Sequence, residues 1–215
     1  MKTIIVANQK GGSGKSTLVT HLAVAAERAG DGPALLTDTD PQGSTADWFN
    51  AREAQTPGYV PTTLATLAEK IDALGAAGAK WLFVDTAPAI NDKNADLLKL
   101  ADLIIVPLCA SPNDLRALSK TLPLLHASGK PFVFVMTRVN PQARVTVQTV
   151  MTLSEHGQVL QPPLRERVSY PTSMIDGRTV QEIDGGGPAG AEVAELWQSV
   201  KGRFDDMTKR RKLKE

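Results

Sequence analysis

The sequence predicts one α/β domain over residues 1–215, with a mostly parallel, twisted sheet and helices on both of its faces. The first observation is that short apolar runs recur along the chain and are typical of buried parallel strands; they are Thr3–Ala7, Ala34–Thr37, Trp81–Val84, Leu103–Leu108 and Phe132–Met136. The second is that amphipathic stretches separate these runs, and such alternation indicates right-handed crossovers within one sheet. A chain of 215 residues with 42% apolar content suits one domain.

Each amphipathic stretch is expected to form a helix. The first, Ser16–Ala29, precedes Gly30, a residue suited to the end of a helix. The last, Ala191–Lys212, follows an expected loop at Gly185–Gly190 and opens the C-terminal segment 191–215. It carries an apolar stripe that we expect to pack into the core; the stripe is Val193, Leu196, Trp197, Val200 and Phe204. The remaining expected helices are Thr62–Leu74, Asn91–Leu100, Asp114–His126 and Val145–His156.

The composition excludes several classes of protein. The single cysteine, Cys109, cannot form an internal disulfide and cannot supply the ligands of an iron–sulfur cluster. No apolar run approaches the roughly 18 residues of a membrane span, and the run after Lys2 is too short for a signal peptide. We therefore expect a cytoplasmic protein.

The C-terminal tail is basic, whereas the net charge of the chain is only +1. A basic tail on a mildly acidic body indicates a polyanion such as DNA as a partner, and a solvated, frayed terminus is the competing interpretation. A membrane-surface helix is less favoured, because past Phe204 the tail offers only Met207 and Leu213 as large apolar residues. The candidate DNA-binding residues are Lys201, Arg203, Lys209, Arg210, Arg211 and Lys212.

The segment KGGSGKST joins an expected strand to an expected helix. Its glycines let successive backbone N–H groups point at an anion, and the helix N-terminus adds free donors. Lys15 would reach the β- and γ-phosphates of a nucleotide, and the Ser16 hydroxyl would bind Mg²⁺. This context predicts a P-loop NTPase fold, although Gln9 stands where the usual pattern has glycine. The expected phosphate-binding residues are Lys10, Gly11, Gly12, Ser13, Gly14, Lys15, Ser16 and Thr17.

Three aspartates, Asp38, Asp40 and Asp85, follow expected strands. In an open parallel sheet, ligands bind at the carboxyl ends of the strands, so we expect these carboxylates to face the glycine-rich segment. Asp85 fits a direct or water-mediated partner of Mg²⁺, and Asp38 can hold one of the waters of the ion. Asp40 is the candidate for orienting the attacking water.

Phosphoryl transfer also needs a cation beside the β–γ bridge. Lys10 stands at the start of the loop, where reaching the nucleotide of a second subunit is geometrically simpler than curling onto its own. We therefore expect slow ATP hydrolysis by a nucleotide-bridged homodimer, with Lys10, Lys15 and Asp40 as catalytic residues. Arg138 and Asn140, just after a strand, are candidates for the base pocket.

Together these segments resemble the ParA/MinD family of deviant-Walker ATPases along almost the whole chain, and they are most similar to short plasmid-type ParA proteins. The resemblance rests on KGGSGKST, on DTDPQGS followed by Trp48, and on FVDTAP; weaker matches are VPLCASPNDL and RERVSYPTSMIDGRTVQE. It implies ATP and Mg²⁺ as cofactors, an ATP-dependent dimer, and non-specific DNA binding that associates the protein with the nucleoid. It also implies that a ParB-like or cargo-adaptor protein stimulates hydrolysis, in partition of plasmid or chromosomal DNA or in positioning of another cargo.

Three other functions compete with this one. They are a MinD-like, membrane-associated positioning ATPase, a dethiobiotin-synthetase-like ATP-dependent ligase, and a scaffold that binds nucleotide without hydrolysing it. The DTDPQGS segment argues against the ligase. The three histidines, His21, His126 and His156, show no metal-ligand spacing and are assigned no role.

Overall fold

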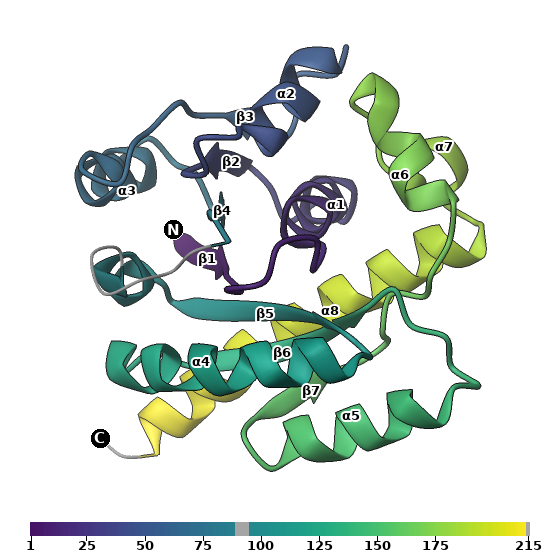
Figure 1. The fold of residues 1–215 in the computed structure, drawn as a ribbon. Coiled ribbons are helices and arrows are strands. Elements are labelled where there is room, and N and C mark those ends of the chain that lie inside the picture. The colour runs from purple at the N-terminus through teal and green to yellow at the C-terminus, as the bar shows by residue number, and fades with distance from the viewer. Residues whose placement is uncertain (89–94, 214–215) are drawn as a thin grey trace.

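The chain forms a seven-stranded sheet in the order β3-β2-β4-β1-β5-β6-β7, seen in a computed structural model that describes residues 1–88 and 95–213 (Figure 1). Every pair of neighbouring strands is parallel. The predicted α/β fold with a parallel sheet is therefore confirmed. The strands are β1 (Lys2–Val6), β2 (Ala34–Asp38), β3 (Gly58–Tyr59), β4 (Trp81–Asp85), β5 (Leu103–Cys109), β6 (Phe132–Thr137) and β7 (Gln158–Leu160).

Helices cover both faces of this sheet (Figure 1). Within residues 1–88 and 95–213, none of them is long and apolar enough to cross a bilayer. They are α1 (Lys15–Arg28), α2 (Ser44–Ala51), α3 (Leu67–Ala76), α4 (Pro112–Ser128), α5 (Arg144–Ser154), α6 (Ser169–Ser173), α7 (Val180–Asp184) and α8 (Pro188–Lys212), with 3-10 turns η1 (Ala95–Leu100) and η2 (Met174–Asp176).

The core consists of two layers, one on each face of the sheet. Successive strand residues point to opposite faces, so Ile4 packs in the layer that holds Leu18 of α1 and Trp197 of α8, whereas Ile5 packs with Leu118 of α4 in the other. Because both faces are dry, the strands carry continuous apolar runs. All five residues of the stripe predicted on the last helix are buried, as expected.

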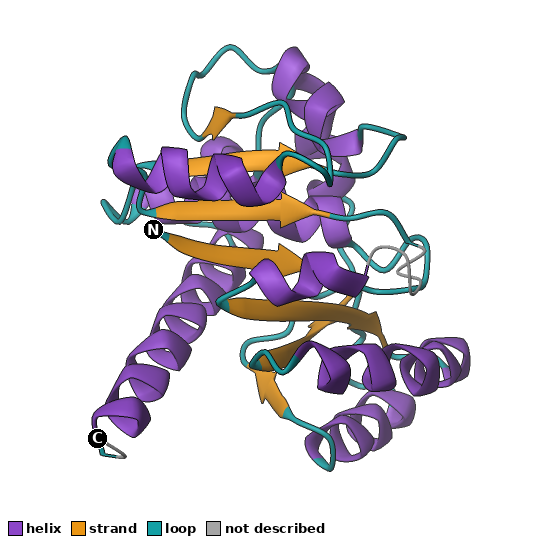
Figure 2. Ribbon diagram, turned by 90° about the vertical axis from the view of Figure 1, so that its left-hand side faces the viewer, coloured by secondary structure: helices purple, strands orange, loops and turns teal. Residues whose placement is uncertain are grey.

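The functional edge of the sheet lies where the strand order reverses. β1 pairs with β4 on one side and with β5 on the other, and a reversal of this kind opens a crevice at the carboxyl ends of the strands. β2 and β4 end in register there, at Asp38 and Asp85. The glycine-rich loop follows β1 at the same edge, on the side to which the strand arrows point in Figure 2.

Several predicted boundaries are wrong. α8 begins at Pro188 inside the expected loop, because proline is tolerated in the first turn of a helix. α3 begins only at Leu67, because threonine side chains before it hydrogen-bond one another instead of continuing the helix. The helix predicted at Asn91–Leu100 lies partly outside the described residues, and its described part is the 3-10 turn η1. Helix α2 was not predicted at all.

Candidate nucleotide-binding site

The phosphate loop is shaped by two glycines in the left-handed region of backbone space. Gly12 has φ 73° and Gly14 has φ 90°. A residue with a Cβ would be strained in this conformation. Two contacts hold the loop in place: the Thr137 hydroxyl donates to the Ser13 carbonyl (2.8 Å), and the Asn8 side chain accepts from the Lys10 N–H (3.0 Å). The loop is thus held in its curled form by buried neighbours.

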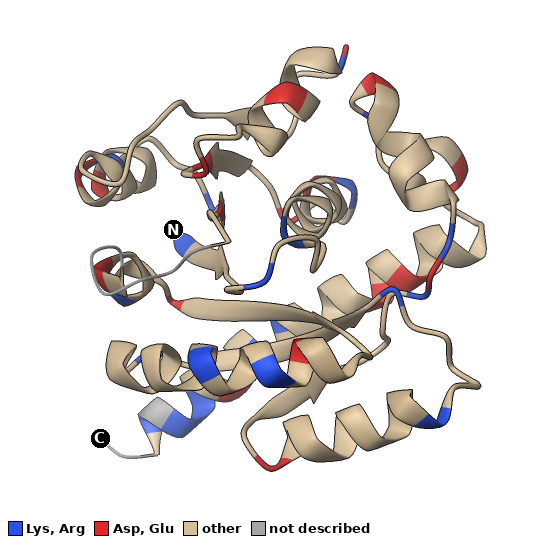
Figure 3. Cartoon of the chain, in the orientation of Figure 1, with Lys and Arg blue, Asp and Glu red and all other residues tan. Residues whose placement is uncertain are grey.

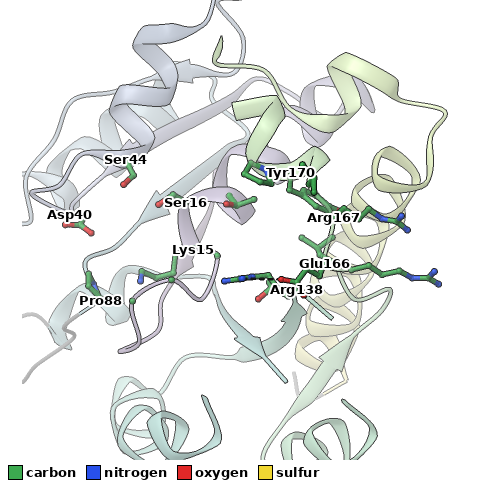
Figure 4. A pocket seen from close by; sticks show the side chains of 18 residues that line it. Lys15, Ser16, Asp40, Ser44, Pro88, Arg138, Glu166, Arg167 and Tyr170 are labelled. Atoms are coloured by element: carbon green, nitrogen blue, oxygen red, sulfur yellow. Dashed lines mark hydrogen bonds and ion pairs between the residues drawn. The ribbon is translucent and has the colours of Figure 1, made fainter. Parts of the chain in front are cut away.

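A cavity of about 650 Å³ opens beside this loop, a size that suits a nucleotide. Residues of the loop and of α1 form one wall, Asp40 and Ser44 lie at a second side, and the segment 164–171 forms the opposite wall (Figure 4). Sequence reasoning missed this third wall, which includes Arg167 and Tyr170. Most of this wall lies in the segment RERVSYPTSMIDGRTVQE, which was matched only as a family pattern, because its return to the cavity depends on tertiary packing.

Lys15 lies at the floor of the site and is 7% exposed. Its Nζ is 3.4 Å from the Lys10 carbonyl oxygen, across the loop. Burial lowers the pKa of Lys15 from its usual value, while the charges of Asp85 and Asp40 oppose this shift. The Lys15 ammonium group therefore lies among the Lys10 carbonyl and two carboxylates, and bound phosphates would add further anionic partners.

Asp38 and Asp85 are joined by Thr45, the second residue of α2. The Thr45 N–H donates to Asp38 Oδ2 (2.9 Å), and the Thr45 hydroxyl donates to Asp85 Oδ2 (2.8 Å). Burial raises the pKa of Asp85 to about 6, against a hydrogen bond from Ser16, and the neighbouring Asp38 charge adds to the rise. Burial likewise raises the pKa of Asp38. Thr45 was not singled out from the sequence.

These residues fit a magnesium ion. Two carboxylates with raised pKa values gain from a nearby cation, and the Ser16 hydroxyl is within hydrogen-bonding reach of Asp85. In the described part of the chain, no three His, Cys, Asp or Glu side chains cluster as a metal site. Ser16, Asp38 and Asp85 alone would supply few ligands. A small set of oxygen donors suits Mg²⁺, because this ion keeps several waters and takes further ligands from substrate phosphates.

Asp40 lies on the turn between β2 and α2 and borders the cavity (Figure 4). Its N–H donates to Asp38 Oδ1 (2.8 Å), and its own Oδ1 accepts from the Gln42 N–H (3.0 Å). The turn thus fixes the position of its backbone relative to Asp38. The carboxylate is partly exposed toward the cavity, as a group that orients water must be.

Lys10 does not line the cavity. Its ammonium group lies 2.6 Å from Oδ2 of Asp114, a fully buried residue in the first turn of α4. Asp114 also receives the Ser111 hydroxyl, and the Cys109 N–H lies 3.4 Å from its other oxygen. Sequence reasoning missed Asp114, although serine three residues before an acid is a capping signal.

The two candidate base-pocket residues differ in placement. Arg138 borders the cavity, has φ 51°, and pairs with Glu166 at 3.2 Å. Asn140 is not among the cavity-lining residues; its side chain accepts from the Gln142 N–H (3.1 Å) in the turn before α5. The base-pocket assignment therefore remains a prediction that favours Arg138.

The basic tail lies away from this site. Lys and Arg gather toward the C-terminal end of α8 (Figure 3), which Figure 2 shows on the side where the strands begin. Lys201 pairs with Asp31 at 2.8 Å, and Arg203 is partly buried. The exposed cations of the described tail are Lys209, Arg210 and Lys212.

The fold and the site define a P-loop nucleotide-binding protein. The chain belongs to the CobQ/CobB/MinD/ParA nucleotide binding domain family, whose model matches residues 4–180. The predicted family resemblance is therefore confirmed.

Three relatives are similar over most of their length. A maintenance of carboxysome distribution protein A from Halothiobacillus neapolitanus is 26% identical over 88% of this chain and 91% of its own. The protein of the same name from Gloeobacter kilaueensis is 34% identical over 73% and 72%. Protein ParA of Rhizobium radiobacter is 29% identical over 79% and 81%.

Solved structures share the fold at low identity. A chain of the MinC:MinD cell division protein complex from Aquifex aeolicus has a TM-score of 0.80 at 14% identity, covering 94% of this chain and 96% of that one. The Cyanothece McdA(D38A)–ATP complex has 0.73 at 15%, covering 95% and 96%. Cobyrinic acid a,c-diamide synthase from Mycobacterium smegmatis, with an ATP analogue and magnesium, has 0.75 at 16%, covering 95% and 96%. The fold alone therefore fits both positioning proteins and synthetases.

Proposed function

We propose that this chain is an ATP-dependent switch of the ParA type, which positions a cargo by cycling between a monomer and an ATP-bridged homodimer. The cargo is a plasmid or chromosome, or a large particle like those named for its carboxysome-distribution relatives. The single observation that carries the proposal is that Lys15 and Asp40 line one cavity of nucleotide size, while Asp38 and Asp85, joined by Thr45, lie directly behind them.

The chemistry that this site supports is slow hydrolysis of ATP. The loop N–H groups and Lys15 would hold the phosphates, and Ser16, Asp38 and Asp85 would hold Mg²⁺, which neutralises charge on the phosphates. Asp40 would orient the attacking water at the open side of the cavity. Lys10 would act on the nucleotide of a second subunit, because its side chain pairs with Asp114 and does not line the cavity of its own chain.

The ATP-bound dimer would bind DNA without sequence preference, and the tail favours DNA over a membrane. A surface helix needs an exposed apolar face, but the apolar stripe of α8 is buried against the sheet. Met207 also packs on that core, so among the described residues past Phe204 only Leu213 is a large, strongly exposed apolar side chain. A ParB-like or adaptor protein would stimulate turnover and set the cargo.

A ligase of the synthetase kind is the second candidate, since a synthetase shares the fold. The two candidates differ in what stimulates ATP consumption. A switch consumes ATP slowly alone and faster with DNA and a partner, whereas a ligase consumes it only with its small carboxylate substrate. A non-hydrolysing scaffold consumes none.

The test combines turnover with oligomeric state. Phosphate release and sedimentation are measured with ATP and Mg²⁺, with and without DNA, for the wild type, Lys10→Ala and Asp40→Ala. We expect an ATP-dependent dimer in the wild type, no turnover in either variant, and nucleotide affinity within about threefold of wild type in monomeric Lys10→Ala. Lys120→Ala, an exposed lysine on α4, is the matched control. Equal loss of binding and turnover in Lys10→Ala would refute the role of that lysine.

A further inference from the structure

Trp48 of α2 and Arg52, which caps the C-terminal end of that helix, are both buried, and neither lines the cavity. Trp48 is 3% exposed and Arg52 is 7% exposed. The guanidinium of Arg52 lies 4.5 Å from the centre of the Trp48 ring, a cation–π contact. A buried arginine is costly unless its donors are satisfied, so the partners of Arg52 show what this end of the helix is built to hold.

Arg52 joins α2 to the segment 177–182. Its Nη1 donates to the Gly177 carbonyl (2.6 Å), and its Nη2 lies 2.9 Å from Oε1 of Glu182. A Cβ on Gly177 would collide with the backbone of Arg52. The Trp48 indole adds a bond to the Arg178 carbonyl (3.0 Å). The end of α2 is therefore seated on this segment with little room to shift.

Glu182 passes the connection into α7. Its carboxylate accepts from the Thr179 N–H (2.8 Å), and the Thr179 side chain accepts from the Glu182 N–H, which makes a capping box at the start of that helix. The same carboxylate therefore caps α7 and pairs with Arg52. Loss of the Glu182 carboxylate would leave the buried charge of Arg52 without its ion-pair partner.

His21 links the same segment to the phosphate loop. The Val180 N–H donates to His21 Nε2 (3.3 Å), so Nε2 is an acceptor and the proton sits on Nδ1, which donates to the Thr17 carbonyl (2.8 Å). Burial lowers the pKa of His21 to about 4, which keeps the ring neutral. Thr17 is the residue with which the loop motif ends, so the chain of contacts reaches the wall of the cavity.

At its other end, α2 touches the metal-site carboxylates through Thr45, and the Asp40 turn immediately precedes it. The helix is thus clamped at both ends. One end is tied to Asp38 and Asp85, and the other is tied through Arg52 to a segment that contacts His21 of α1.

We propose that Arg52 is a positioning residue, which fixes α2, and with it Asp40, relative to the phosphate loop. Arg52 does not line the cavity, so it acts on the site through α2. This inference rests on the proposed function, in which Asp40 orients the attacking water. Nucleotide binding depends on the loop and Lys15, whereas turnover depends also on where Asp40 lies.

The test compares Arg52→Gln and Arg52→Lys with Arg178→Gln, a matched control whose exposed side chain pairs with Asp176. Lysine keeps the charge but loses the planar fork that reaches several acceptors. In folded Arg52 variants we expect ATP affinity within about threefold of wild type, with turnover reduced on the order of tenfold to a hundredfold. Arg178→Gln retains both. Unchanged turnover, or a parallel loss of affinity and turnover, overturns the proposal.

Amide exchange of nucleotide-free protein provides a readout that needs no hydrolysis. We expect exchange in α2 to accelerate about tenfold in Arg52→Lys and in Glu182→Gln, while exchange in β5 is unchanged. If the wild type proves inactive, the proposed function fails while this measurement still decides the inference. If Arg52→Gln does not fold, the lysine variant decides it, and unchanged exchange in α2 refutes the link.

Discussion

The ammonium group of Lys10 lies 2.6 Å from a carboxylate oxygen of Asp114, a residue fully buried in the first turn of α4. Lys10 is a third exposed, so it is the partner that can leave. Its departure toward a second subunit would leave a buried carboxylate without its cation, which costs several kcal/mol. The pair therefore opposes the dimer that the proposed cycle requires.

Asp114→Asn is accordingly expected to favour the dimer. The amide keeps an acceptor for the Ser111 hydroxyl but removes the charge that holds Lys10. In an Asp40→Ala background with ATP and Mg²⁺, we expect the dimer dissociation constant to fall on the order of tenfold, or about 1.4 kcal/mol. Sedimentation velocity measures it, with exposed Asp96→Asn as the control. A weaker dimer would show that the pair supports assembly.

Asp85→Asn is expected to stabilise the metal-free fold while abolishing magnesium binding. The pKa of Asp85 is raised to about 6, so the folded chain holds this proton more tightly than the unfolded chain does. Its contribution to stability is full below about pH 4 and is lost as the pH rises through 6. At pH 7.5, in chelator, we expect a gain of up to about 3 kcal/mol in urea denaturation. Asp47→Asn, a change at an exposed aspartate, is the control. An equal gain in stability from Asp85→Asn at pH 5 and pH 7.5 would contradict protonation of Asp85 as the cause.

His21 predicts the opposite dependence on pH. Its pKa is lowered to about 4 by burial, so the unfolded chain binds the proton more tightly. The stabilising contribution is complete above about pH 6.5 and is lost as the pH falls toward 4, by up to about 3 kcal/mol. His21→Gln keeps one donor and one acceptor without titrating. Denaturation of the wild type and of His21→Gln is measured between pH 7 and 4. We expect the difference between their free energies of unfolding to shrink as the pH falls, and a constant difference would contradict the role of His21 titration.

The tail makes a prediction about salt. Replacement of Lys209, Arg210 and Lys212 by alanine is expected to lower the slope of log affinity for DNA against log salt by about 2 to 3. Lys120→Ala is the control, because that lysine is exposed on α4 and lies outside the tail. Fluorescence anisotropy on ATP-loaded protein measures both, and anionic vesicles test the membrane alternative. An unchanged slope in the triple variant would place the DNA-binding surface elsewhere.

The sequence predicted the parallel sheet and the nucleotide edge because both depend on local patterns. A run such as Trp81–Val84 is apolar at every position only when both faces are covered. Gly12 and Gly14 indicate a backbone conformation in which a residue with a side chain would be strained. Asp38 and Asp85 each end a strand. They lie side by side because their strands are parallel neighbours in register.

Helix α2 shows where the patterns fail. It has only eight residues, too few for a clear helical period, and its N-cap Gly43 lacks a capping side chain. Its stability comes from Trp48 and Arg52 packing against a segment about 130 residues later. No local feature announces such contacts.

The sequence by itself determined the class of fold, the glycine-rich loop between the first strand and the first helix, and the aspartates at the carboxyl ends of β2 and β4. Only the tertiary structure decided that Lys10 rests on Asp114, 104 residues away, that Thr45 bridges two aspartates, and that Arg52 meets Glu182. The reason is that periodicity and backbone preference are properties of neighbouring residues. The partner of a polar side chain is set by which distant elements pack together, and by the cost of leaving a buried donor or acceptor unpaired.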